Sequence, residues 1–333
     1  MGRGRIVKSL QYIVMTLSML FMAQVKAIPI SVFVPFGIIE GANAVVIQNT
    51  GITNTNSGDI PALSDARLDI KVNAVVVLHA WKKNFLVYGI LPHANINFDT
   101  NPHLLNIVAS QTNNFPFKLH TEDFVDPIVG FNYRFYETTG PNWLLNSGFA
   151  FTLGIPGSEY HKFVPESPMV GDIRYFQAGR GNWNPNLAWQ LFYESTDWML
   201  AALVGYSHFF AHDGFRHPAE IEYDLSLGRR IYPFRYESET VYNWRLVGYI
   251  EFLGKWTDKF QSSSALENRA DNTGRDNWGS NLIKFAPGIK WYHVSGYEVG
   301  FQYMTRLSHH LNGTQPVKFS RQYLFVVAKE WSK

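Results

Sequence analysis

Cysteine is absent from the 333-residue sequence, so neither a disulfide framework nor a thiolate metal site can form. Charge is scarce and nearly balanced, because charged residues make up 17% of the chain and the net charge is +2. With so small a charge, and with no basic stripe interleaved with aromatics, we expect no nucleic-acid partner. Beyond residue 27, no apolar stretch approaches the roughly 20 residues that a spanning helix needs.

The first 27 residues have the parts of a secretory signal peptide. Three basic residues precede an apolar run, Tyr12–Ala23, and small residues close the segment at Val25 and Ala27. A short apolar core followed by small residues is typical of a peptidase site, so we expect export and cleavage after Ala27. Residues 28–41 form a lead segment, for which a leading strand, a periplasmic tail and a segment folded into the lumen are all open.

From residue 69 onward the chain alternates between two chemically different faces with a period of two, as strands do. The segment Glu220–Ile231 is a clear example. One face of it carries Ile221, Tyr223, Leu225 and Leu227, and the other carries Glu222, Asp224, Ser226 and Arg230. A soluble sandwich also alternates, so the decision depends on strand length and loop length.

Twelve such strands are predicted, and their connections alternate between brief and long. Short periplasmic turns and long outer loops explain that regularity, and termini on one side require an even number of strands. Residues 42–333 are therefore predicted to be an all-β fold, a transmembrane antiparallel β-barrel of about 12 strands. The predicted strands are 42–49, 69–81, 84–97, 125–137, 143–155, 184–194, 198–210, 220–232, 242–256, 280–292, 297–307 and 321–331.

Aromatic residues make up 16% of the chain, and several tryptophans stand near the ends of predicted strands. Amphipathic rings at these positions suit the two interfacial girdles of a membrane barrel. They are Trp81, Trp143, Trp183, Trp198, Trp256, Trp291 and Trp331. The loop Asn101–Glu122 is unusually apolar, and we expect it to fold over the outer mouth or to pack on its neighbours.

Several sequence segments resemble those of a known family, the outer-membrane proteins named for the meta-pathway of phenol degradation. They are the turn Lys83–Leu86, the strand ending at Pro92, the strand from Asp126 to Phe135, and the segments Phe151–Gly157, Leu282–Trp291 and Leu311–Thr314. The likeness covers about residues 69–331. The resemblance implies a transporter-like barrel in the Gram-negative outer membrane that takes up small hydrophobic or aromatic compounds. Outer-membrane lipid and the barrel-assembly machinery are the other expected partners, and no cofactor is expected.

If the apolar faces meet lipid, the opposite faces line the lumen. The functional interpretation is that their polar residues set selectivity for a solute, and the structural one is that ion pairs merely satisfy buried charges. The sequence leaves both open. The lumen-lining candidates are Lys71, Asn132, Arg134, Glu222, Asp224, Arg230, Arg245, Glu251, Lys284, Lys290, Glu298 and Arg306.

An enzymatic alternative comes from His293 and Ser295, whose spacing resembles the His-x-Ser part of an outer-membrane lipid hydrolase. A serine nucleophile needs a base and a third group that orients the base, and no Asn or Asp stands at a matching height on the neighbouring strand. We therefore predict a polar turn with Gly296 and no enzyme. A non-transport structural barrel is the remaining alternative. No histidine spacing predicts a metal site.

Overall fold

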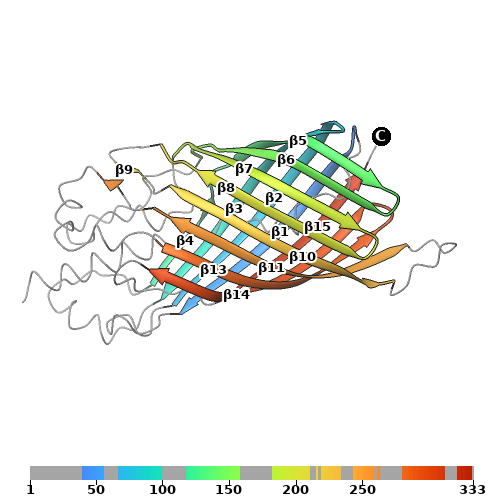
Figure 1. The fold of residues 1–333 in the computed structure, drawn as a ribbon. Helices are drawn as coiled ribbons and strands as arrows, with labels where there is room; N and C mark the ends of the chain where they lie inside the picture. The colour runs from blue at the N-terminus through green and yellow to red at the C-terminus, as the bar shows by residue number, and fades with distance from the viewer. Residues whose placement is uncertain are drawn as a thin grey trace, which may run out of the picture.

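The structure is a computed structural model in which twelve long strands close into a barrel (Figure 1). The described part of the chain contains no helix that is both long enough and apolar enough to cross a membrane. The predicted signal peptide and most of the lead segment lie outside the described residues. These residues are 40–55, 67–99, 118–157, 182–210, 215–216, 219–233, 243–258, 261–262, 280–311 and 321–331.

The barrel strands follow chain order, and each is antiparallel to both of its neighbours. Two further strands of two residues each, β9 (Phe215–Arg216) and β12 (Gln261–Ser262), pair with one another. The barrel strands are β1 (Asn43–Thr55), β2 (Arg67–Lys82), β3 (Phe85–Asp99), β5 (Ile128–Gly140), β6 (Trp143–Gly154), β7 (Asn184–Ser195), β8 (Trp198–Ser207), β10 (Glu220–Tyr232), β11 (Trp244–Thr257), β13 (Ser280–His293), β14 (Tyr297–Leu311) and β15 (Arg321–Trp331).

The ring closes where the first strand meets the last. β1 pairs with β2 along one edge and with β15 along the other, in register from Asn43↔Trp331 to Thr53↔Arg321. Because every strand of the ring has two neighbours, the sheet has no open edge strand, whose unpaired backbone groups lipid could not satisfy. The prediction of a twelve-strand antiparallel barrel is confirmed.

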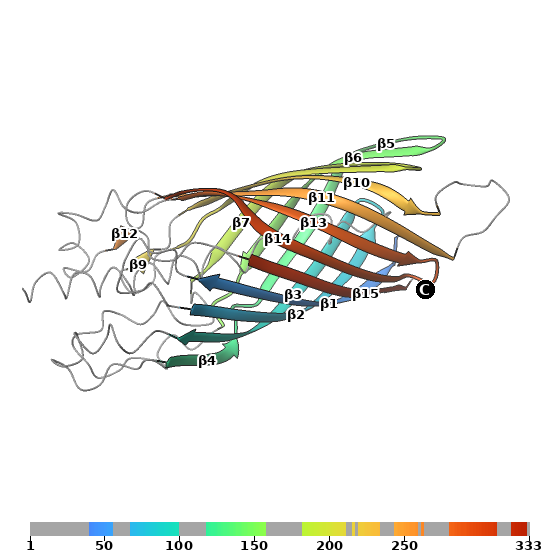
Figure 2. The same ribbon diagram turned by 90° about the horizontal axis from the view of Figure 1, so that it is seen from below.

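The two ends of the barrel differ in the length of their connections. We call one the turn end, because residues 83–84, 141–142, 196–197 and 294–296 make tight turns there. The first residue of β1 and the last of β15 also lie at this end, which carries the C-terminus in Figure 2. The β10–β11 connection, residues 233–243, is the longer exception at this end. The opposite end, where most of the longer connections leave the strands, is called the loop end.

The strand predicted at 125–137 is interrupted. β5 begins only at Ile128, and a separate strand, β4 (Lys118–Phe124), continues the ladder on β3 toward the loop end. Proline explains the break, because Pro92 on β3 and Pro127 offer no N–H to a ladder. Other bonds compensate: the Val125 amide donates to the Pro92 carbonyl at 2.9 Å, and the Gly157 amide donates to the Asp126 carboxylate at 3.0 Å.

The structure differs from the sequence prediction in the bounds of two segments. Residues 118–122, predicted to be part of an outer loop, belong to β4, while residues 100–117 of that loop lie outside the described residues. The first strand, predicted to end near residue 49, runs on to Thr55 because it pairs with both β2 and β15 over almost its whole length. Long-range pairing therefore extends a strand whose own alternation is weak.

Candidate functional site: the lumen

Alternation along β10 identifies the two faces of the wall. Ile221, Leu225 and Leu227 are exposed, whereas Asp224 and Ser226 between them are buried. The exposed residues belong to the apolar set that covers the outside of the barrel, so the buried polar face is the inner one. The same parity applies to β11, where Glu251 is fully buried between exposed Ile250 and Phe252.

Buried ion pairs occupy the inner face of β10 to β14. Near the loop end, the Lys255 ammonium lies 2.6 Å from the Glu220 carboxylate and 3.9 Å from that of Glu222. Toward the turn end, Lys290 lies 2.7 Å from Glu298 and is completely buried. Buried charges are tolerated only when they are paired in this way. We call this part of the inner face, from β10 to β14, the ionic wall.

Some inner side chains reach past a neighbouring strand to bond with the next one. The amide of Gln302 on β14 donates to Glu251 on β11, crossing β13 where Ala286 and Gly288 leave room. Across β6, the Asn132 amide on β5 donates to Gln190 on β7 at 3.0 Å. Small residues on the middle strand thus allow the inner face to be braced across strands as well as along ladders.

A third strand-skipping bond joins the ionic wall to β15. The Lys284 ammonium on β13 donates to the Gln322 amide oxygen at 3.0 Å, and both side chains are buried. Gln322 is the register partner of Ile52 on β1. Beyond this point most inner-face residues are apolar.

The inner face of β1 to β3 is mostly apolar, although β1 also places Gln48 and Thr50 there, where the Gln48 amide donates to the Thr50 hydroxyl at 3.1 Å. Ile52, Ile70 and Ile96 stand in one register row across the three strands, and Val46, Val76 and Ile90 stand in another. All six side chains are buried. We call this surface the apolar wall. The lumen is therefore bounded by two chemically opposite walls.

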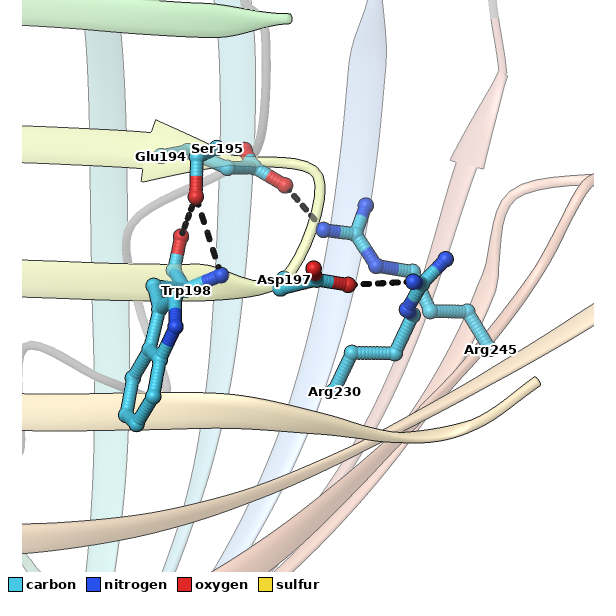
Figure 3. Close-up of polar contacts among 6 residues, drawn as sticks. All are labelled: Glu194, Ser195, Asp197, Trp198, Arg230 and Arg245. Atoms are coloured by element: carbon cyan, nitrogen blue, oxygen red, sulfur yellow. Dashed lines mark hydrogen bonds and ion pairs between the residues drawn. The ribbon is translucent and has the colours of Figure 1, made fainter. Parts of the chain in front are cut away.

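At the turn end, two ion pairs connect the β7–β8 hairpin to β10 and β11 (Figure 3). Glu194 accepts a hydrogen bond from the Arg245 guanidinium, and Asp197 accepts one from Arg230. The hairpin itself is fixed by Ser195, whose hydroxyl accepts a bond from the Trp198 amide at 3.0 Å. Figure 3 shows the two arginine side chains reaching the hairpin side by side.

Most of the sequence-derived candidates lie on the inner face. Asn132 and Arg134 are on β5, and Arg134 pairs with Glu137 close to the turn end. Arg306 is the register partner of Lys284 but is exposed. The candidates on the ionic wall are Glu222, Asp224, Arg230, Arg245, Glu251, Lys284, Lys290 and Glu298.

Lys71 does not fit the expectation. It is exposed on the outer face of β2, between Asn95 on β3 and Gly51 on β1, while its neighbours Ile70 and Val72 point inward. The rule that placed polar residues inside fails because β2, from Asp69 to Asn73, alternates with its polar residues on the outer face and with Ile70 and Val72 on the inner face. Farther along β2, Val75 to Val77 make both faces apolar, so the sequence gives no parity signal there.

The apolar wall was missed because polar residues were assumed to mark the inner face of every strand. A signal did exist, because β2 contains the run Ala74–Leu78, whereas a strand with a polar lumen face would alternate throughout. A continuous apolar run of strand length indicates that both faces are covered by apolar neighbours.

The His293–Ser295 pair of the enzymatic alternative does make contact, with 2.5 Å between His293 Nδ1 and the Ser295 hydroxyl. The same nitrogen lies 3.2 Å from the Ser295 amide, and both residues belong to the tight turn ending at Gly296. The centres of the His293 and Trp244 rings lie 4.4 Å apart. Among the described residues, no carboxylate is bonded to the His293 imidazole. The geometry is that of a polar turn.

A protein metal site needs several histidine, cysteine or carboxylate side chains that converge on one point. Within the described ranges, no group of three or more such side chains is arranged to hold one. His212 and His217 lie outside those ranges.

Fold and lumen together define a class: the chain is a twelve-stranded antiparallel barrel of the outer-membrane type. No family model matches it, and no curated protein does either, so membership of the phenol meta-pathway family stays a prediction.

Solved structures do match the fold. An outer membrane channel from Pseudomonas putida F1 superposes with a TM-score of 0.62 at 12% identity, over 88% of this chain and 97% of that chain. The translocator domain of an autotransporter from Neisseria meningitidis matches with a TM-score of 0.46 at 9% identity, over 97% of this chain and 99% of that chain. At these identities the likeness concerns the fold alone.

Proposed function

We propose that this protein is a channel of the Gram-negative outer membrane for passive uptake of small hydrophobic or aromatic compounds. It is exported by a signal peptide cleaved after Ala27, inserted by the barrel-assembly machinery, and surrounded by outer-membrane lipid. The family resemblance of residues 69–331 supports the substrate class, and the fold shared with a bacterial outer membrane channel supports the transport role.

The apolar wall is the observation that carries the proposal. A channel for ions or sugars lines the path of its solutes with polar groups that replace their hydration. Here Ile52, Val76 and Ile96 stand on the inner face of three adjacent strands instead. An apolar solute gains free energy when it leaves water for such a surface.

The ionic wall would act on the same solute from the opposite side. Its ion pairs satisfy one another, so a solute meets fixed dipoles rather than bare charges. A hydroxyl or carboxylate on an aromatic ring can accept or donate bonds there while the ring contacts the apolar wall. Both interpretations of the lumen-lining residues are therefore compatible, with pairing as their structural role and solute selection as their functional one.

The experiment is single-channel recording of the refolded mature chain in a planar bilayer, with benzyl alcohol and benzoate added as blockers. We expect stable openings that both solutes interrupt. Val76 and Val77 offer a matched pair, because they are adjacent valines on opposite faces of β2. Val76→Thr should weaken the block and Val77→Thr should leave it unchanged. A heat-modifiable barrel that never opens in any trial would contradict the proposal.

A further inference from the structure

The inner face carries a compact hydrophobic cluster in the half of the barrel nearer the turn end. Phe192 on β7, Met199 and Ala201 on β8, and Val247 on β11 are buried against one another, at 0–3% exposure. Leu203 and Tyr292 pack on the cluster. These residues come from an arc of strands that extends from β7 to β13, so their side chains meet inside the lumen.

The Arg245–Glu194 pair crosses the lumen beside this cluster. Arg245 is on β11 and Glu194 is on β7, and β8 and β10 lie between those strands. With strands about 4.8 Å apart, the path along the wall is roughly 14 Å, which two long side chains can span only as a chord through the interior. The pair is therefore a strut across one side of the lumen.

Two further pairs fix the strut in place. Arg230 bonds to the Asp197 carboxylate, and its backbone amide donates to the Asp197 carbonyl at 2.9 Å. Lys290, paired with Glu298, stacks 5.1 Å from the centre of the Tyr292 ring. Each cation has its own carboxylate, so the assembly is electrically balanced and does not repel itself.

We propose that this assembly, made by Phe192, Tyr292 and the Arg245–Glu194 strut, is the constriction that determines which molecules leave the lumen at the turn end. The proposal rests on the channel function above and names the place and the residues where selection occurs. The size of the solute is the first criterion for passage, because the rings of Phe192 and Tyr292 project into the lumen from β7 and β13, the two ends of the arc. Hydrogen bonding is the second, because the strut presents guanidinium and carboxylate groups to whatever passes.

The test combines single-channel recording with uptake of aromatic solutes of increasing size into proteoliposomes. Phe192→Ala and Arg245→Ala should each raise the conductance about two-fold or more and admit larger solutes, because each removes part of the narrowest section. The matched control is Arg229→Ala. Arg229 adjoins Arg230 in sequence but is exposed on the outer face, 5.1 Å from the Trp198 ring.

Folding is checked for each variant by heat-modifiable mobility on gels. Because Arg245→Ala leaves a carboxylate without its partner, the charge exchange Glu194→Arg with Arg245→Glu serves as a second variant, and it should restore the wild-type conductance. If the Phe192 and Arg245 variants conduct as the wild type does, the proposal of a constriction is wrong, while the proposed channel function is retained. If no version passes ions or solutes, the channel function itself fails, and the constriction with it.

Discussion

Tyr323 on β15 lies directly across the barrel seam from Gly51 on β1, and its ring fills the space where a side chain at position 51 would begin. A Cβ placed on Gly51 would stand 2.2 Å from the ring. Covering a strand glycine with an aromatic ring offsets the missing side chain and fixes the register of the two strands. Other register pairs of the same kind are Tyr88 with Gly130, Tyr223 with Gly254 and Tyr249 with Gly288.

Substituting Gly51→Ala should therefore weaken the seam. The methyl group must displace the Tyr323 ring, and overpacking of this kind costs about 1–3 kcal/mol of unfolding free energy. Urea unfolding in detergent micelles measures the change. Gly89→Ala on β3 is the control, since a Cβ there meets nothing within 4 Å. Equal losses in the two variants would show that the ring contact is irrelevant.

The buried Lys255–Glu220 pair predicts a different pattern of stability. Lys255→Met alone leaves the Glu220 carboxylate buried without its nearest cation, and breaking a buried pair costs about 3–5 kcal/mol. Replacing both residues, as Lys255→Met with Glu220→Leu, should cost much less than the sum of the single changes. Unfolding free energies of the three variants test this double-mutant cycle. Strictly additive losses would contradict the pairing.

The sequence predicted the fold closely, because in most strands one face is apolar and the other is polar. The bounds of β10 and β15 agree with the alternation to the residue. The break between β4 and β5 was not predicted, since it depends on Pro92 of β3 lying opposite the segment that contains Pro127, which only the register reveals.

The site was predicted less well than the fold. The assumption that polar residues face the lumen holds for Glu251 and Lys290, but it fails for Lys71, because the polar residues of β2 near it lie on the outer face. The partner of Arg245 is Glu194, 51 residues away and on a strand that is not its neighbour. Such a pair follows from the curvature of the closed wall, which no local pattern encodes.

Charge on the loop-end half of the ionic wall should influence ion preference. The four carboxylates of Glu220, Glu222, Asp224 and Glu251 outnumber the three cations of Lys255, Lys284 and Arg306 there. Glu251→Gln removes one negative charge while keeping the shape, so the preference for cations should fall. Reversal potentials across a salt gradient measure it. Phe252→Leu, which changes the adjacent outward residue, is expected to have no effect on the reversal potential; a shift there instead would argue against a luminal Glu251.

Tryptophan depth offers a direct test of membrane placement. Six tryptophans stand at or next to the strand residues closest to the turn end, where an interfacial girdle is expected. In single-tryptophan variants their fluorescence should be quenched more by shallow than by deep brominated lipids, whereas Trp189, in the middle of β7, should show the reverse. Uniform quenching would be incompatible with a girdle. The six are Trp81, Trp143, Trp198, Trp244, Trp291 and Trp331.

The strand-skipping bonds also determine how the barrel resists deformation. These bonds all join strands of the arc from β5 to β15, and they oppose changes in the curvature of this arc. They are made by Asn132, Arg245, Gln302 and Lys284. In the apolar wall of β1 to β3, the strands are joined by their ladders, and the inner apolar side chains meet through dispersion contacts, which have no preferred direction. The cross-section is thus rigid on one side and compliant on the other, and thermal breathing of the lumen should take place mainly by flexing of the apolar side.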